Sequence, residues 1–138
     1  MPGKAFDIVM DEHSKRKIPN LLSFDSTERH FATAASSMVS KKPKQTYVNS
    51  QWLLGKSPAS PQVQRFTEHG YPYTFVPLDS RGTVGIQHDD DTVFSPELLV
   101  SMMLQYLKTI AEKQVGQEAK DAVITVCVTG SEAVLWNQ

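Results

Sequence analysis

The longest hydrophobic pattern in the chain predicts one long helix from Pro96 to about Val115. Its apolar residues recur at the i, i+3, i+4 and i+7 spacing of a single helical face. They are Leu99, Met102, Met103, Tyr106, Leu107 and Ile110. Ser95 suits the N-cap because its hydroxyl can accept a free backbone N–H, and Gly116 is a natural stop. Burying each such side chain contributes roughly 1.5–3 kcal/mol, so we expect this face to pack against the rest of the protein.

Short apolar runs predict several strands. Residues 6–10 and 21–24 are expected to be strands, and a turn-forming cluster follows at 25–28. We interpret the two strands as a hairpin and its exit. Residues 121–128 are almost continuously apolar, which is typical of a strand buried on both faces of a sheet.

A second hairpin is predicted further along the chain. Residues 73–76 and 83–86 are rich in residues that favour strands. The turn between them is expected at 79–82, where Asp79, Ser80 and Gly82 are typical turn residues.

The remaining segments predict less regular structure. Residues 33–39 favour a short helix, which Pro43 would stop because proline lacks an N–H and clashes with the preceding turn. Residues 52–55 favour one or two helical turns. Residues 57–70 are polar and contain two prolines, so we expect a loop there.

The composition of the 138-residue chain fits a globular protein, with 40% hydrophobic and 21% charged residues. The formal net charge of −1 gives no reason to expect nucleic acid or a membrane as a partner. The single cysteine, Cys127, excludes a disulfide framework and a multi-cysteine zinc site. No apolar stretch approaches the ~20 residues that span a bilayer, and the first residues lack the apolar core of a signal peptide.

The run His88-Asp89-Asp90-Asp91 suggests either a metal site or a solvated turn. Calcium loops alternate oxygen ligands and add a glycine and a distal glutamate, which are missing here. We therefore predict a solvated turn. The lysines at 41–44 suggest a targeting or phosphate-binding patch or a solvated loop, and the near-neutral charge favours the loop.

The sulfur-containing residues also favour structural roles. Cys127 falls in an apolar run, where a thiol is usually inert packing rather than a nucleophile paired with a histidine. Met102 and Met103 lie on the predicted helical face, so we interpret them as core rather than as an adaptable binding surface.

Short strings in a fixed order along the chain carry a family resemblance. Two of them are Leu53-Leu54-Gly55-Lys56 and Lys42-Pro43-Lys44-Gln45-Thr46, and the others lie at 17–19, 28–35, 94–97 and 121–126. Together they resemble the first lobe of the heat-shock protein 70 ATPase domain over roughly residues 2–128. Details at 2–9, 14–17 and 120–126 most resemble the large hypoxia-up-regulated (glucose-regulated) branch of that family in the endoplasmic reticulum.

The resemblance implies a mixed α/β (α+β) fold. Residues 1–128 would form a partial nucleotide-binding domain, namely lobe I of an actin-like ATPase with a hairpin-bearing subdomain and one long helix. Residues 129–138 would form an unmatched tail. Some positions depart from the family: Ala32 and Thr33 stand where it has glycine and aspartate, and Cys127 stands where it has proline.

The resemblance also bears on catalysis, since Gln51 occupies the position of a family lysine. Glutamine is uncharged and cannot stabilise a developing phosphate charge as an ammonium does. The family's Asp-Leu-Gly loop would precede the matched region, and its second phosphate loop, metal-binding acids and adenosine pocket would follow it. ATP and Mg²⁺ serve the family, but we expect no catalytic, cofactor-binding or metal-binding residue in this chain and no ATP hydrolysis by it alone.

The implied function of the parent protein is ATP-dependent chaperone work, in the stress response, on unfolded proteins and with other chaperones in the endoplasmic reticulum lumen. A second hypothesis is a non-catalytic interaction module that pairs with another chaperone through an exposed sheet edge beside residues 6–10 or 121–128. An unrelated small enzyme is a third.

Overall fold

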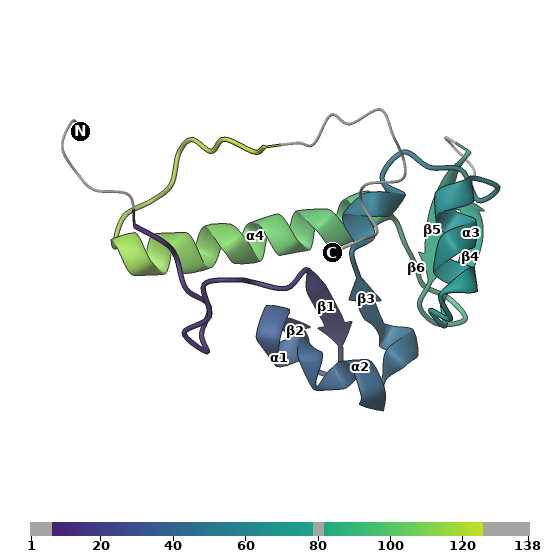
Figure 1. Ribbon diagram of the computed structural model, residues 1–138, viewed down its shortest axis with the longest axis horizontal. Helices are drawn as coiled ribbons and strands as arrows, with labels where there is room; N and C mark the ends of the chain where they lie inside the picture. Colours follow the sequence, from purple (N-terminus) through teal and green to yellow (C-terminus); the bar gives the residue numbers. More distant parts are fainter. Residues whose placement is uncertain (1–6, 79–81, 126–138) are drawn as a thin grey trace.

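The computed structural model describes residues 7–78 and 82–125, which form two small antiparallel sheets and one long helix (Figure 1). The first sheet has the order β2-β1-β3 and the second the order β4-β5-β6. The strands are β1 (Leu21–Phe24), β2 (Arg29–Phe31), β3 (Thr46–Val48), β4 (Thr74–Leu78), β5 (Thr83–Gln87) and β6 (Val93–Phe94). The α-helices are α1 (Ala32–Ser36), α2 (Met38–Lys41), α3 (Pro61–Glu68) and α4 (Pro96–Val115), and η1 (Pro43–Gln45) and η2 (Ser50–Leu53) are 3₁₀ helices. This arrangement confirms the mixed α/β class.

Helix α4 has the bounds that the hydrophobic pattern predicts. The Ser95 hydroxyl accepts the N–H of Leu98 at 3.2 Å, and Gly116 ends the helix in the left-handed conformation at φ 74°. The predicted apolar face is only partly covered. Leu99, Met103 and Ile110 are buried, whereas Met102 and Tyr106 are half-buried and Leu107 is exposed.

The predicted loop at 57–70 is wrong, because residues Pro61–Glu68 form α3. The prolines suggested a loop, but Pro61 lies at the first helical position. The backbone N–H there has no partner within the helix, so proline does not disrupt it. The Ser60 hydroxyl caps the helix by accepting the Val63 N–H at 3.5 Å. Val63 and Phe66, one turn apart, are buried on one face.

The predicted strand at 6–10 is wrong over its described residues 7–10, and residue 6 lies outside them. The chain there runs beside the end of α4 and bonds to the Gln114 side chain. The Gln114 amide oxygen accepts the Met10 N–H at 3.1 Å, and its nitrogen donates to the Ile8 carbonyl at 3.3 Å. The first hairpin is therefore a different one, in which β1 pairs with β2 on one side and β3 on the other.

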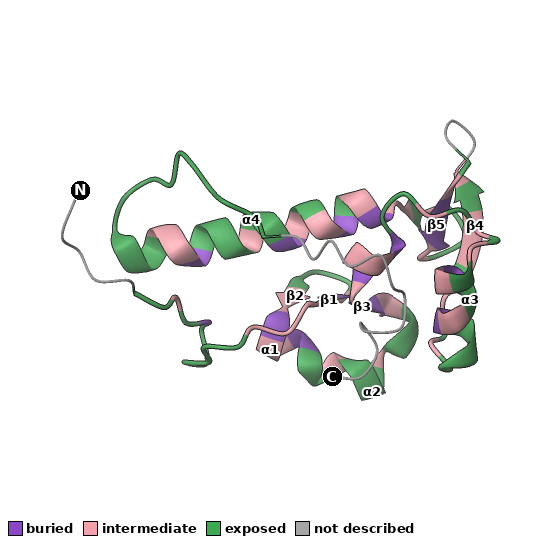
Figure 2. Cartoon of the chain, turned by 45° about the horizontal axis from the view of Figure 1, so that its top comes forward, coloured by how far each residue is buried: buried purple, intermediate pink, exposed green. Residues whose placement is uncertain are grey.

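The predicted buried strand at 121–128 is wrong over its described residues, 121–125, which have no regular structure. Val123 is 94% exposed and Ile124 65% exposed. An apolar run becomes a buried strand only where other strands flank it, and no described strand pairs with this one. Figure 2 colours this segment, which follows α4 and turns back along it, as exposed. Residues 126–128, with Cys127, lie outside the described part.

The other predicted elements are confirmed with small changes. β4 and β5 form the second hairpin, with Phe75 opposite Ile86. Of its turn, 79–81 lie outside the described residues, and Gly82 has φ 63°. The helix predicted at 33–39 is two short ones, α1 and α2, separated at Ser37. The helical turn predicted at 52–55 is η2, and Gly55 follows it at φ 65°.

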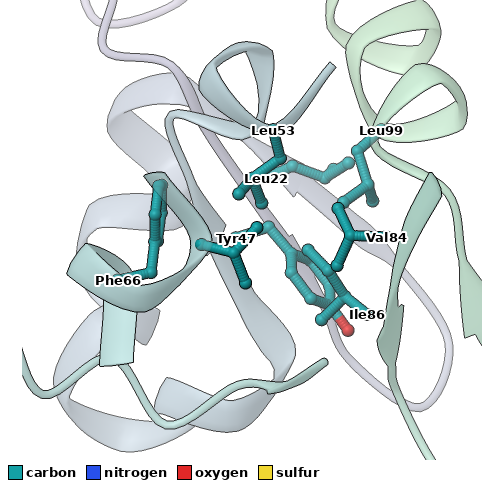
Figure 3. Close-up of a cluster of buried hydrophobic side chains, with 8 residues drawn as sticks. Leu22, Tyr47, Leu53, Phe66, Val84, Ile86 and Leu99 are labelled. Carbon is teal, nitrogen blue, oxygen red and sulfur yellow. The ribbon is translucent and has the colours of Figure 1, made fainter. Parts of the chain in front are cut away.

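One hydrophobic core joins the sheets to the helices (Figure 3). Its buried members come from both sheets and from η2, α3 and α4. They are Leu22, Tyr47, Leu53, Val63, Phe66, Val84, Ile86 and Leu99. Partly buried aromatic residues pack against this core, including Phe24, Tyr73 and Phe94. The two small sheets thus share a core, and η2 packs against α4.

Candidate functional site around Gln51

Gln51 lies in the short helix η2, at a position fixed by its neighbours. Asn49 precedes the helix in the left-handed conformation, at φ 50° and ψ 39°, which asparagine tolerates better than most residues. Its N–H donates to the Asn20 carbonyl at 3.2 Å, which ties the start of η2 to the start of β1. Two residues after Gln51, the Leu53 side chain is buried in the core. The backbone of Gln51 is therefore fixed before it by the Asn49–Asn20 hydrogen bond and after it by the buried Leu53 side chain.

The side chain of Gln51 is also held. Its amide oxygen accepts a hydrogen bond from the side-chain nitrogen of Asn20, and the residue is half-buried. Asn20 is 31 residues away in sequence, so no local pattern indicated this partner. Both groups are neutral amides, which can hydrogen-bond a ligand but cannot balance its charge.

ATP and Mg²⁺, the ligands that the family resemblance implies, do not fit these residues on their own. A triphosphate needs cations or a cradle of N–H groups to offset its charge. The side-chain partner of Gln51 is the neutral amide of Asn20, and the Gln51 oxygen is already used in that bond.

The acidic turn after β5 has the conformation that the sequence predicts. The Asp89 carboxylate accepts the N–H groups of Asp91 at 3.1 Å and Thr92 at 2.7 Å, and all three aspartates are exposed. Hydrogen bonds, chiefly from Thr92, hold the pKa of Asp89 below its usual value. Within the described ranges, no three His, Cys, Asp or Glu residues are grouped so as to hold a metal. The predicted absence of a metal site stays a prediction.

His88 has a packing role rather than a place in the acidic turn. Its Nδ1 lies 2.8 Å from the Tyr47 hydroxyl, and its ring contacts Phe24 and Phe94. Because Tyr47 is in β3 and His88 follows β5, this hydrogen bond links the two sheets. Burial raises the pKa of Tyr47, so the hydroxyl keeps its proton.

The lysines at 41–44 do not form the predicted loop, because Lys41 ends α2 and Lys44 lies in η1, with Lys42 between the two helices. Lys42 makes an ion pair with Asp25, in the turn between β1 and β2. The hydrogen bond from Lys42 is the main cause that lowers the pKa of Asp25. Lys41 and Lys44 are exposed. Met103 is buried, as predicted, and Met102 is half-buried, packs against the hydrophobic core and also lines a surface groove.

That groove lies beside α4 and was not indicated by the sequence. It has a volume of about 660 Å³ and is lined by Arg29, Phe31, Leu98, Ser101, Met102, Gln105, Tyr106 and Thr109. We call it the α4 groove. At its floor the Phe31 and Tyr106 rings stack, with centroids 4.8 Å apart and planes 2° from parallel. Phe31 belongs to β2, a strand that the sequence analysis did not predict, which is why the groove was missed.

None of the described helices is long and apolar enough to cross a membrane.

Comparisons with known proteins agree on one family. The family described as "Hsp70 protein" matches residues 1–128. Hypoxia up-regulated protein 1 of Homo sapiens is 40% identical over 136 residues, covering 96% of this chain and 13% of the human protein. The Xenopus laevis protein of that name is 39% identical, covering 91% and 19% of the two chains. The Danio rerio protein of that name is 35% identical, covering 91% and 13%. The chain thus spans less than a fifth of the length of these relatives.

Proposed function

Because this chain belongs to the Hsp70 family, we propose that it forms part of the nucleotide-binding domain of an ATP-dependent chaperone. Residues 1–128 would form part of lobe I of that domain, and residues 129–138 would be a tail that does not belong to the lobe. The described core, which joins two sheets to α4, supports a scaffold role. The catalytic groups would then come from outside the described residues of this chain.

The observation that carries the proposal is the pair formed by Gln51 and Asn20. A lysine at position 51 would bring a positive charge to the nucleotide, but Gln51 is neutral and its oxygen is occupied by Asn20. We therefore propose that the 138-residue chain alone neither hydrolyses ATP nor binds Mg-ATP at micromolar concentration.

Isothermal titration calorimetry with Mg-ATP tests this directly. The chain, its Gln51→Lys variant and the control Gln64→Lys, which adds the same charge to an exposed site in α3, should all give no micromolar binding. No phosphate should be released above the buffer rate. Micromolar binding by the unmodified chain would overturn the proposal.

We further propose that the parent protein acts on unfolded proteins in the lumen of the endoplasmic reticulum. The similarity to proteins named hypoxia up-regulated protein 1 supports a role in the stress response. An antibody against residues 96–115 should detect the protein in microsomes, where it resists protease until detergent opens the vesicles. Digestion of the protein in intact vesicles would contradict the lumenal location.

A second candidate function is a non-catalytic module that pairs with another chaperone. The exposed apolar residues Val123 and Ile124 favour it, because such a segment can add to the edge of another sheet. Native mass spectrometry of the chain mixed with a purified Hsp70-type chaperone should then show a one-to-one complex. Loss of the complex in a Val123→Asp variant would support the module, and a mixture without any complex would argue against it.

A further inference from the structure

A second hollow adjoins the α4 groove and has different chemistry. The groove itself is mostly apolar, and its floor is the stacked pair of Phe31 and Tyr106. The second hollow, with a volume of about 290 Å³, shares these two rings and Arg29 with the groove. It is also lined by the carboxylates of Glu12 and Glu28, so we call it the acidic hollow. The two hollows thus meet at Arg29, Phe31 and Tyr106.

The groove lies on a side of α4 that further parts of the family domain would leave open. Outside the groove, the exposed apolar residues of the helix are Leu104, Leu107 and Val115, which form one stripe. Because a helix turns about 100° per residue, this stripe lies roughly 140° around α4 from the groove-lining positions. The family match continues to residue 128, so the stripe is the face that more of the domain would cover. The groove points the other way, and its lining uses no residue after Thr109.

The charged residues of both hollows have no charged partner among the residues that the structure describes. Arg29, Glu12 and Glu28 are all exposed, and no ion pair within the described ranges includes any of them. Burial, and then the charges of Glu12 and Asp11, raise the pKa of Tyr106. The Glu12 carboxylate therefore lies close enough to act on the Tyr106 hydroxyl. A ligand in these hollows could satisfy both signs of charge.

The chemistry changes in a fixed order along this surface. Apolar side chains such as Leu98 and Phe31 line the groove, Arg29 lies where the two hollows meet, and the carboxylates line the acidic hollow. An arginine suits a phosphate, and carboxylates beside the aromatic ring of Tyr106 suit an ammonium group. An apolar chain, then a phosphate, then a quaternary ammonium is the order of groups in a lipid with a phosphocholine headgroup.

We propose that the α4 groove and the acidic hollow together bind a single-chain lipid with a phosphocholine headgroup. The chain would lie along the apolar groove, on the stacked rings of Phe31 and Tyr106. The phosphate would pair with Arg29, and the ammonium group would contact the carboxylates of Glu12 and Glu28. This site is independent of the proposed nucleotide-related function.

The size of the site suits one lipid molecule. The groove has a volume of about 660 Å³, which is within the range of small-molecule sites. Leu98 and Thr109, the first and last lining residues of α4, are three turns apart, roughly 16 Å along the helix axis. An extended dodecyl chain has a similar length, so dodecyl amphiphiles are suitable probes.

Isothermal titration calorimetry of the full chain tests the order of chemistry with three probes, each below its micelle concentration. Dodecylphosphocholine carries both charges, dodecyl phosphate only the anion and dodecyltrimethylammonium only the cation. We expect dodecylphosphocholine to bind at least ~10-fold more tightly than the other two. Free phosphocholine, which lacks the chain, should show no binding at the same concentrations. Equal or tighter binding of either singly charged probe would overturn the proposal.

Charge variants test each headgroup contact separately. Arg29→Gln should weaken the binding of dodecylphosphocholine at least ~5-fold without weakening that of dodecyltrimethylammonium, because it removes only the phosphate partner. The double variant Glu12→Gln, Glu28→Gln should weaken dodecylphosphocholine to a similar extent without weakening dodecyl phosphate. Lys44→Gln and Glu68→Gln remove exposed charges outside both hollows and should change little. A loss that is equal for every probe, or no loss at all, would contradict the proposed contacts.

Two further variants locate the chain of the lipid on α4. Ser101→Trp fills the groove and should abolish binding, whereas Leu107→Gln changes the apolar stripe and should leave binding intact. Both positions are exposed, so circular dichroism should show unchanged folding. The reverse result would place the lipid on the stripe and would overturn the proposal.

Flotation with phosphatidylcholine vesicles distinguishes a site for one lipid from a membrane-binding face. The chains of a bilayer are out of reach of the groove, so we expect the protein to stay at the bottom of the gradient. Flotation of the protein with intact vesicles, without calorimetric binding of monomeric dodecylphosphocholine, would show a membrane-binding face in place of the proposed site.

Discussion

The hydroxyl of Thr33 donates a hydrogen bond to the carboxylate of Asp11, and this bond joins the loop before β1 to the first turn of α1. Asp11 is buried and also accepts the N–H groups of His13 at 2.9 Å and Lys15 at 2.8 Å. These hydrogen bonds, that of Thr33 first, hold the pKa of Asp11 below its usual value. The start of α1 is thus bonded to a carboxylate whose ionised form is favoured in the folded protein.

We predict that Thr33→Val destabilises the protein at pH 7 but has little effect in acid. A group whose pKa is lowered by folding contributes stability above its unfolded pKa, about 3.9 for aspartate. That contribution is lost as the pH falls through the lower pKa of the folded state. Urea unfolding of both proteins at pH 7 and at successively lower pH measures this. A gap between the two proteins that stayed constant with pH would show that the hydroxyl acts without the carboxylate.

Thr33→Asp should be more harmful than Thr33→Val at pH 7. It would restore the residue type that the family resemblance implies, but it would place a second carboxylate against Asp11. The cost should fall sharply in acid, where one of the two carboxylates takes a proton. A Thr33→Asn variant, which has the same shape without the charge, is the control. Equal stability of the aspartate and asparagine variants would argue against charge repulsion.

Ala32→Gly should leave stability unchanged or raise it by up to about 1 kcal/mol. Ala32 begins α1 at φ 50°, a left-handed conformation that costs an alanine roughly 1–2 kcal/mol relative to glycine. Ala32 is fully buried, so removal of its methyl group offsets part of the gain, by about 0.8 kcal/mol. Thermal unfolding measures the sum. Ala35→Gly, a buried position without the left-handed backbone, should be clearly destabilising in the same assay.

The sequence predicted the parts of the fold that local chemistry determines. Helix α4 has a capping serine, a periodic apolar face and a terminal glycine, and its predicted bounds are confirmed. The family was also predicted, from short strings that keep their order, and the match over 1–128 confirms it. The family resemblance implies a glycine at position 32, and the structure shows why: the backbone of Ala32 is left-handed, a conformation that favours glycine.

Structure that depends on distant partners was not predictable in the same way. The run at 121–125 has the composition of a buried strand, yet no described strand pairs with it, and it is exposed. Residues 7–10 contact the Gln114 side chain, more than a hundred positions away, instead of a neighbouring strand. The partner of Gln51, Asn20, lies 31 positions away and was not indicated by any local pattern either. Whether position 51 has lost a catalytic role stays a prediction until nucleotide binding is measured.

Phe66→Ala should lower the free energy of unfolding by about 3–5 kcal/mol, because it leaves a large cavity in the core. Phe66 is fully buried, and its ring contacts those of Tyr71 and Phe75. The control Thr67→Ala lies on the exposed face of the same helix and should cost less than about 0.5 kcal/mol. Urea unfolding of both variants measures the difference. Similar small effects would mean that residues 61–68 do not pack as α3.

Tyr73→Phe should lower the free energy of unfolding by about 1–3 kcal/mol, because it leaves buried backbone groups of β3 without a partner. β3 is an edge of its sheet, and the Tyr73 hydroxyl takes the place of a neighbouring strand. It accepts the Val48 N–H at 3.0 Å and donates to the Thr46 carbonyl at 2.7 Å. Burial raises the pKa of Tyr73, so the hydroxyl remains a donor throughout the neutral range.

Hydrogen exchange distinguishes this role from simple packing. In Tyr73→Phe the ring and its contacts remain, but the Val48 amide should exchange much faster relative to those of β5. The control Tyr71→Phe removes a hydroxyl from the neighbouring ring, whose centroid lies 5.6 Å from that of Tyr73. It should leave the Val48 amide protected. If both variants exposed Val48 equally, the aromatic cluster as a whole would be protecting β3, and the hydroxyl of Tyr73 would have no special part in it.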